Sequence, residues 1–499
     1  MVESYDVVVV GASVAGAAFA MALRDEGLRI LVVDPQIDFD EARMTWGHDI
    51  EPNGLLALNW LGLLDDVERF GARHDSWTAE RAGGGRLSAW QYRDLPVTHA
   101  YAVCIRAHLL RRLLRERLCG QPGVDVVIPG SFVEYRRVDG GIHVDIEVEG
   151  ARRTVSARLL VGADGPRSRV RAQAGIGTTV RRYSHSWVDT IMSRRDDEIT
   201  EGHIYFGRGS YLGVVPTRPG ELVAFELTAC RDQRTYRDQV GSIERFREDY
   251  TRRAPILAGP VDSVDSWDRV TVAPGFRMRA RRWVDDHVAL VGDAALTVNP
   301  ITSQGVSLAL EDALTLAVVT RQAFRRNDLR AHALRPYELW RRPQAEAVQE
   351  LGDISLWGFT RRGRMLSAMK ERTLRRLDND RDFRTYVMAS YCGLRWLTPK
   401  ALTFMDAARI LGVAPKRPAV FAPIRSSRRD LGGQRRQGLS TRGRSAGSPP
   451  FAADAEAAVA AFPVAAVEAH QARTLIRAGT PAAGAPTGVV SGAARLTTR

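Results

Sequence analysis

A glycine-rich turn near the N-terminus has the residues and spacing that bind the diphosphate of a dinucleotide. Gly11 and Gly16 bracket the segment GASVAG, which follows the apolar run 5–10 and precedes an alanine-rich segment, so we expect strand, turn and helix in succession. Gly11 then permits a tight turn, Gly16 permits close helix–strand packing, and the N–H groups of the helix start face the phosphates. Ser13 occupies the position of the usual second glycine. Asp34 follows at the end of the next predicted strand, where an acidic residue accepts hydrogen bonds from ribose hydroxyls.

Two further segments place an aspartate directly after a buried strand. Residues 159–171 (LLVGADGPRSRVR) form an apolar strand that runs into an Asp-Gly turn at Asp164. In residues 288–305 (VALVGDAALTVNPITSQG), Asp293 follows a second apolar strand, beside the small residue Gly292. The helix predicted after this loop points its N-terminus at the loop, where its dipole stabilises negative charge on a bound group. Each segment taken alone is also compatible with an ordinary turn.

The remaining pattern indicates an α/β protein with an inserted antiparallel sheet and C-terminal helices. Alternating apolar and polar residues over 124–161 predict hairpins, and a second strand-rich stretch covers about 183–273. Helical periodicity returns over 303–325 and 337–411. From residue 425 the composition changes to Gly, Ala, Ser, Pro and Arg, which bury little apolar surface, so we expect a disordered tail.

The composition excludes several other classes of protein. With 499 residues, 44% of them hydrophobic, the chain is long enough for a large core. Its four cysteines show neither CxxC nor zinc-like spacing, no signal-peptide pattern opens the chain, and no apolar run is long enough to span a membrane. We therefore expect a reduced, cytoplasmic protein, with peripheral contact with a membrane surface left open. Residues 425–499 carry +7 of the net charge of +13, so the basic excess lies mostly in the tail and we expect no nucleic-acid partner.

Taken together, the three segments resemble those of the FAD-dependent monooxygenases of the aromatic hydroxylase (para-hydroxybenzoate hydroxylase-like) family. The patterns GxSxxG at 11–16, ADGxxSxVR at 163–171 and GDAA…P…QG at 292–305 occur in that order, and the similarity spans about residues 5–350. The resemblance implies FAD as the cofactor and names no catalytic residue and no metal site. The site residues it implies are Gly11, Ser13, Gly16 and Asp34 for the ADP half, Asp164 in a dual nucleotide role, Gly292 and Asp293 at the ribityl chain, Pro300 and Gly305 at the isoalloxazine edge, Arg106 at the flavin side chain, and Arg43 in the mobile-flavin region.

The same resemblance implies a Rossmann-type FAD-binding domain that is interrupted by a substrate-binding sheet. The expected parts are 1–176 for the first part of the FAD-binding domain, 177–275 for the substrate-binding sheet, 276–350 for the second part of the FAD-binding domain, 351–424 for a helical region and 425–499 for the tail. Tyr205, Phe206, Tyr211 and Phe225 in the sheet are candidates for the wall of a substrate cavity.

The activity implied is oxygen insertion. FAD, reduced by NADPH or NADH, would react with dioxygen to a flavin hydroperoxide that transfers one oxygen atom to an aromatic, quinone-like or polyene small molecule. No second strand–GxGxxG–helix unit is visible, so NAD(P)H would bind transiently or a separate flavin reductase would supply the electrons. Two alternatives stay open: an FAD-dependent reductase of isoprenoid double bonds (geranylgeranyl reductase-like), and a non-catalytic binding protein of the same fold.

Overall fold

The computed structural model describes residues 2–36, 44–195 and 199–394. Arg43, the end of the predicted helical region and the predicted tail lie outside these residues. By its internal contacts the chain divides into residues 1–424 and 425–499, and every described residue belongs to the first of these units.

A six-stranded sheet forms the centre of the nucleotide-binding half, in the order β19-β20-β13-β2-β3-β9. All neighbouring strands are parallel except β19 and β20. Helix α1 (Val14–Ala22) packs on this sheet and β11 of a smaller sheet also contacts it, which explains why its central strands are continuous apolar runs. The strands are β2 (Val7–Val10), β3 (Ile30–Val33), β9 (Val124–Val127), β13 (Leu159–Gly162), β19 (Val284–Asp285) and β20 (Val288–Leu290).

Two smaller sheets flank this centre. The hairpins predicted within 124–161 are confirmed, because β10, β11 and β12 pair antiparallel, with β1 beside β12. A three-stranded sheet in the order β4-β8-β5 leads into α4 and lies between the two halves of the molecule. The strands are β1 (Glu3–Ser4), β10 (Ser131–Val138), β11 (Gly141–Val148), β12 (Ala151–Ala157), β4 (Gly47–Ile50), β5 (Ala72–His74) and β8 (Ala102–Arg106).

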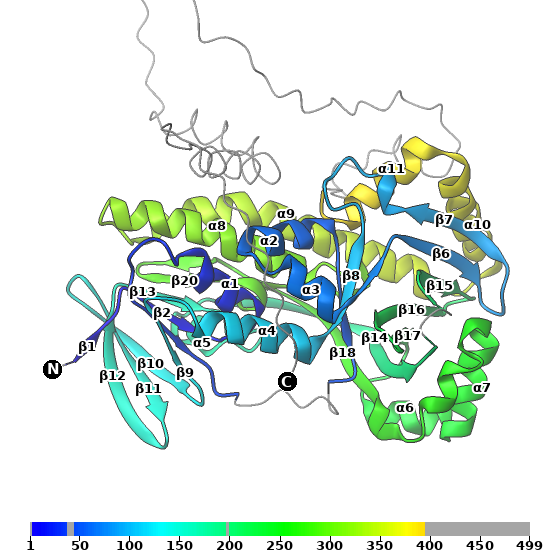
Figure 1. The fold of residues 1–499 in the computed structure, drawn as a ribbon, viewed down its shortest axis with the longest axis horizontal. Coiled ribbons are helices and arrows are strands. Elements are labelled where there is room, and N and C mark those ends of the chain that lie inside the picture. The colour runs from blue at the N-terminus through cyan, green and yellow to red at the C-terminus, as the bar shows by residue number, and fades with distance from the viewer. Residues whose placement is uncertain (1, 37–43, 196–198, 395–499) are drawn as a thin grey trace, which may run out of the picture. The chain divides into compact units, whose positions relative to one another are not determined.

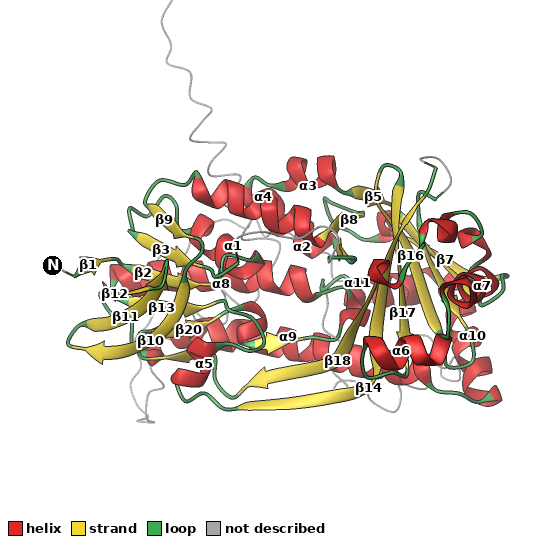
Figure 2. Cartoon of the chain, turned by 90° about the horizontal axis from the view of Figure 1, so that it is seen from below, coloured by secondary structure: helices red, strands yellow, loops and turns green. Residues whose placement is uncertain are grey.

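An eight-stranded sheet lies at the opposite end of the described chain from β10–β12 (Figure 2). Its order is β21-β18-β14-β17-β16-β15-β6-β7, and only β15 and β6 are parallel neighbours. The sheet is larger than the predicted segment 177–275, because β6 and β7 from the first part of the chain and β21 from the second part extend its two edges. The strands are β6 (Ser76–Arg81), β7 (Arg86–Gln91), β14 (Thr178–Ser193), β15 (Gly202–Phe206), β16 (Tyr211–Arg218), β17 (Glu221–Thr228), β18 (Val270–Ala280) and β21 (Leu296–Thr297).

Long helices connect the two halves. In Figure 1, α8 and α9 run side by side from the six-stranded sheet toward the eight-stranded one, and α8 packs against α1, α2 and α9. Helices α6 and α7 were not predicted; their aromatic residues Tyr236, Phe246 and Tyr250 form a separate core with strand residues of the large sheet. Besides α1, the helices are α2 (Pro52–Leu61), α3 (Leu64–Phe70), α4 (Ala107–Cys119), α5 (Arg169–Gln173), α6 (Gln233–Val240), α7 (Ile243–Arg253), α8 (Gly305–Arg325), α9 (Ala331–Thr360), α10 (Arg364–Asn379) and α11 (Arg381–Tyr391).

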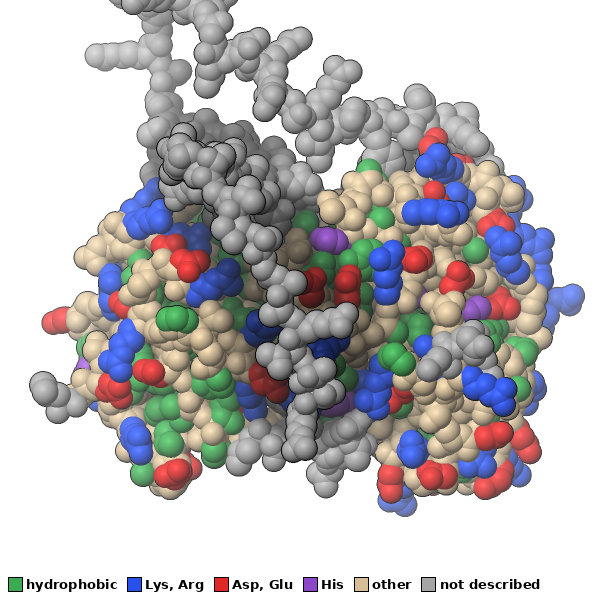
Figure 3. Space-filling view, viewed as in Figure 1, with side chains coloured by type: hydrophobic (Ala, Val, Ile, Leu, Met, Phe, Trp, Pro, Cys, Tyr) green, Lys and Arg blue, Asp and Glu red, His purple; other side chains and the backbone are tan. Residues whose placement is uncertain are grey.

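The surface of the described residues carries charges of both signs. On the face drawn in Figure 3, arginine and lysine side chains are interspersed with aspartate and glutamate. None of the helices in the described ranges is both long and apolar enough to cross a membrane. All four cysteines lie within the described ranges, where none of them forms a disulfide.

Candidate active site

The three predicted loops lie at one edge of the parallel sheet and share one cavity. They follow β2, β13 and β20, which are neighbours in the sheet, so the carboxyl ends of these strands place the loops side by side. The cavity has a volume of about 820 Å³. Its lining includes seven of the predicted site residues: Gly11, Ser13, Asp34, Asp164, Asp293, Pro300 and Gly305.

The first loop forms a cradle in which a side chain has no room. Gly11 has φ +108°, and a Cβ at this position would lie 2.4 Å from the carbonyl oxygen of Ala163. A Cβ on Gly16 would lie 1.9 Å from the carbonyl oxygen of Gly11. Helix α1 then begins at Val14 without a side-chain cap, and its first residues line the cavity. The loop therefore presents backbone N–H groups to the cavity with nothing between them and a ligand.

Asp34 is hydrogen-bonded to this loop and forms an ion pair with helix α4. Its Oδ2 accepts a hydrogen bond from the N–H of Ala12 at 2.7 Å, and its Oδ1 accepts one from the N–H of Gln36 at 2.8 Å. The guanidinium of Arg115 on α4 lies 3.5 Å from Oδ1. The carboxylate is thus held at the end of β3, on the wall of the cavity.

We expect Asp34→Ala to weaken FAD binding by about 1.5–3 kcal/mol, the range for hydrogen bonds to a charged group, which corresponds to roughly ten- to a hundredfold. Titration of the apoprotein with FAD, followed by flavin fluorescence, measures this change. Asp268→Asn removes a carboxylate that is 97% exposed and is the matched control. Equal affinity of the parent and Asp34→Ala would remove Asp34 from the site.

The second loop is hydrogen-bonded to the third loop. Asp164 Oδ2 accepts hydrogen bonds from the N–H groups of Arg169 and Val170 and so begins α5, while its Oδ1 is buried without a partner in the described part of the chain. Arg171 donates to the carbonyl oxygen of Pro166 at 2.7 Å and to that of Ala294, in the third loop, at 2.8 Å. Arg171 therefore fixes the second loop against the third.

Replacing Arg171 with Met should lower the free energy of unfolding by about 2 kcal/mol, because the carbonyl oxygens of Pro166 and Ala294 lose their buried guanidinium donor. It should also weaken FAD binding, since the two loops are no longer held together. Denaturant unfolding monitored by circular dichroism gives the first quantity. A change below about 0.5 kcal/mol, the range of ordinary surface substitutions, would mean that the two loops hold their places without this side chain.

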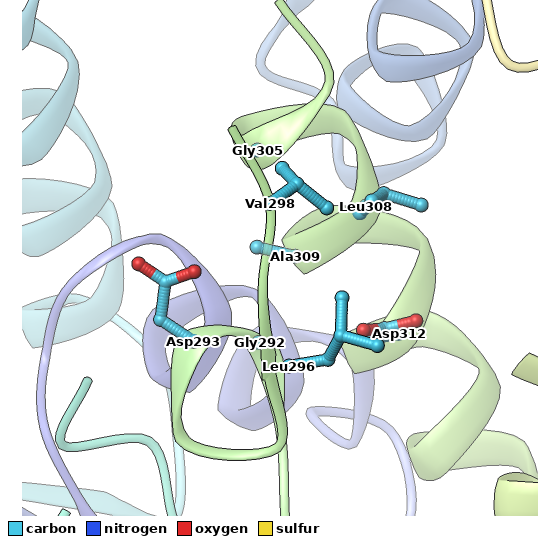
Figure 4. A pocket seen from close by; sticks show the side chains of 8 residues that line it. All are labelled: Gly292, Asp293, Leu296, Val298, Gly305, Leu308, Ala309 and Asp312. Atoms are coloured by element: carbon cyan, nitrogen blue, oxygen red, sulfur yellow. The ribbon is translucent and has the colours of Figure 1, made fainter. Parts of the chain in front are cut away.

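The third loop runs along the start of α8. Figure 4 shows Gly292 and Asp293 on the loop, with Gly305 and Ala309 on the helix beside them. Burial raises the pKa of Asp293 to about 6, and the positive charge of Arg111 acts against this shift. Helix α8 begins at Gly305, so its N-terminus faces the cavity that Pro300 and Gly305 line.

Arg106 lies elsewhere than the resemblance implies. It is the last residue of β8, it is buried, and its side chain donates to Glu221 Oε2 at 2.9 Å and to the carbonyl oxygen of Met44 at 3.1 Å. It does not line the cavity, whereas Arg111, one and a half turns further along, does. Arg111 lines the cavity, and the negative charges of Asp34 and Asp293 both act on its guanidinium.

The part of the cavity away from the glycine loop combines apolar and aromatic side chains with two carboxyl groups and one imidazole. Of the four predicted wall residues, only Phe225 lines it; Tyr205, Phe206 and Tyr211 are buried in the cores on the two faces of the large sheet. The residues that line this part are Trp46, His48, Asp49, Cys104, Trp187, Asp189, Val215, Val223, Phe225 and Leu227. Trp46, Asp49 and Asp189 were not predicted, because a strand pattern does not show which strands pair across the cavity.

Comparison with known proteins identifies the family. The family model described as "FAD binding domain" matches residues 4–351. The chain is 28% identical over 370 residues to 6-methylpretetramide 4-monooxygenase of Streptomyces rimosus, which covers 73% of this chain and 87% of the relative. It is also 28% identical over 350 residues to a ubiquinone hydroxylase of Rhodospirillum rubrum, and this match covers 68% of this chain and 78% of the relative.

Solved structures share the fold. p-Nitrophenol 4-monooxygenase from Pseudomonas putida has a TM-score of 0.68 at 18% identity, over 79% of this chain and all of that one. A probable FAD-dependent monooxygenase from Pseudomonas aeruginosa has a TM-score of 0.65 at 24% identity, over 73% of this chain and 99% of that one. The chain therefore belongs to the FAD-binding-domain family of FAD-dependent aromatic hydroxylases and monooxygenases.

Proposed function

We propose that this chain binds FAD in the 820 Å³ cavity and inserts one oxygen atom from dioxygen into an aromatic, quinone-like or polyene small molecule, with NAD(P)H as reductant. The observation that carries the proposal is the shared cavity itself: three loops that are far apart in sequence meet there beside an aromatic wall. The reductant reaches the flavin by transient binding or through a separate reductase.

The residues present fit the cofactor. The cradle at Gly11 and Gly16 excludes side chains and leaves helix N–H groups for a diphosphate. Arg111 lines the same cavity, where it would offset the diphosphate charge. Asp164 Oδ1 is a buried acceptor that a hydroxyl or amide of a bound nucleotide would satisfy.

FAD supplies the electron transfer and the activation of dioxygen when it is bound. The chain's own residues position the cofactor, stabilise negative charge and exclude water from the site. The N-terminus of α8 stabilises negative charge at Pro300 and Gly305, Asp293 holds hydroxyl groups of the cofactor, and the apolar wall around Trp187 and Phe225 excludes water from the reacting centre.

The test uses the purified full-length protein. We expect flavin absorbance close to one FAD per chain, and oxygen uptake that depends on NAD(P)H and rises when a substrate is added. With isotopically labelled dioxygen, the product should gain one labelled oxygen atom, whereas a reductase of double bonds would add two hydrogens and leave the label in solution. A colourless protein that FAD does not restore would contradict the proposal and favour a binding protein of the same fold.

A further inference from the structure

The substrate end of the cavity contains two carboxyl groups. Asp49 comes from β4, whose register pairs it with Cys104 of β8, and Asp189 comes from β14, where it lies opposite Phe225 of β17. Both carboxylates act on Cys104: burial, and then the charges of Asp49, Glu221 and Asp189, raise the pKa of its thiol. Both carboxyl groups line the cavity, Asp49 from the three-stranded sheet and Asp189 from the eight-stranded sheet.

One carboxylate oxygen of Asp49 has a hydrogen-bond partner among the described residues, and the other has none. Its Oδ1 lies 2.8 Å from Nε2 of His74, while its Oδ2 is buried and has no hydrogen-bond partner within the described ranges. The side chain is 8% exposed and lines the cavity. A buried carboxylate oxygen without a partner is costly, so a bound molecule with an O–H or N–H group would satisfy it.

His74 holds the carboxyl group of Asp49 in place from behind the cavity wall. Its Nδ1 faces the carbonyl oxygen of Ser76 at 3.3 Å, and because a carbonyl can only accept, Nδ1 carries a proton. Burial opposes the charged imidazole, but the carboxylate of Asp49 and its hydrogen bond prevail and raise the pKa of His74. The imidazolium then donates through Nε2 to Asp49 from behind the wall. His74 is in this way a positioning residue, and Asp49 Oδ2 remains an acceptor.

His74 is paired with Asp49 behind the wall, and among the described lining residues no arginine or lysine is paired with Asp49 or Asp189. Arg111 is the only arginine or lysine among the described lining residues, and Asp34 and Asp293 are the carboxylates whose charges act on it. His48 does not supply a charge either, because burial, and then the charge of Arg111, lower its pKa to about 3. A carboxylate on a substrate would have to leave water without an opposite charge to meet it.

We infer that the substrate is an aromatic molecule without a carboxylate, which donates a hydrogen bond from a hydroxyl or an amine to Asp49, with Asp189 as a second acceptor. This inference rests on the proposed function and narrows its substrate class.

Three para-substituted phenols test the inference on the FAD-loaded protein: tyramine, whose side chain is cationic, tyrosol, whose side chain is neutral, and para-hydroxyphenylacetate, whose side chain is anionic. Binding is measured by the change in flavin absorbance and by quenching of tryptophan fluorescence, since Trp46 and Trp187 line the cavity. We expect tyramine and tyrosol to bind roughly tenfold or more tightly than para-hydroxyphenylacetate. Equal or tighter binding of para-hydroxyphenylacetate would overturn the inference.

Asp49→Asn adds the residue-level test, with Asp268→Asn as the control at an exposed carboxylate. Because the amide retains the shape but loses the charge, the preference for tyramine over para-hydroxyphenylacetate should shrink by about tenfold in Asp49→Asn and stay unchanged in the control. An unchanged preference in Asp49→Asn overturns the role of Asp49. Flavin content is measured in the same samples: a flavin-loaded protein that prefers the carboxylate contradicts only this inference, whereas a protein that binds no flavin contradicts the proposed function.

Discussion

Gly16→Ala should yield a folded protein that has lost most of its FAD. The new Cβ would lie 1.9 Å from the carbonyl oxygen of Gly11, and both groups belong to backbone that cannot rotate away. The start of α1 and the Gly11 turn must therefore separate by about 1.5 Å to reach an ordinary van der Waals contact of 3.4 Å, which moves the N–H groups away from the diphosphate. We expect FAD affinity to fall by at least about a hundredfold, because both the turn and the helix start lose their positions.

The matched control for this change is Gly358→Ala. Gly358 lies in α9, and a Cβ there would meet no atom within 4 Å. Alanine in a helix interior is favoured over glycine by about 0.5–1 kcal/mol, so this variant should keep its flavin and be slightly more stable. Flavin-to-protein absorbance ratios and FAD titrations give the comparison, and circular dichroism checks that Gly16→Ala is folded. If Gly16→Ala retains flavin as well as Gly358→Ala does, the diphosphate does not lie on this turn.

The meeting of the three loops could be predicted from the sequence because its causes are local or follow from sheet topology. Gly11 and Gly16 are required by a turn of six residues, and each aspartate follows an apolar strand. Once such strands are parallel neighbours, their carboxyl ends must meet at one edge. This is why Asp34, Asp164 and Asp293 line one cavity although they are far apart in the chain.

The substrate end could not be predicted in the same way, because its residues depend on which face each strand turns inward. Tyr205 and Phe206 are adjacent in β15 and so point to opposite faces of the sheet, and neither lines the cavity. Asp49 becomes a lining residue only through the pairing of β4 with β8. Which arginine of this segment lines the cavity depends on where β8 ends and α4 begins. Arg106, at the end of β8, is hydrogen-bonded to Glu221, and Arg111, on α4, lines the cavity.

Arg341→Met should be the most destabilising of the substitutions considered, at about 3–5 kcal/mol, which is the usual cost of breaking a buried ion pair. Arg341 is buried on α9 and joins it to α8: its guanidinium donates to Asp312 Oδ1 at 2.6 Å, to Glu311 Oε2 at 2.8 Å, and to Gln344 on its own helix. Methionine fills a similar volume but leaves Asp312 without its cation. Arg330→Met, which removes an exposed ion pair with Asp328, should cost less than about 1 kcal/mol and is the control.

The cost of Arg341→Met should also grow as the pH rises. Burial already raises the pKa of Asp312 to about 6, although Arg341 lowers it, so removal of Arg341 raises that pKa further. A carboxyl whose pKa is higher in the folded state than in the unfolded state binds a proton on folding, and its contribution to stability is lost as the pH rises from about 4 through the folded-state pKa. The deficit of the variant relative to the parent should therefore be smaller at pH ~5 than at pH ~8, as measured by urea unfolding at both values. If the difference in free energy of unfolding between the parent and Arg341→Met is the same at both pH values, Asp312 stays ionised without Arg341 and pairs with another cation between α8 and α9.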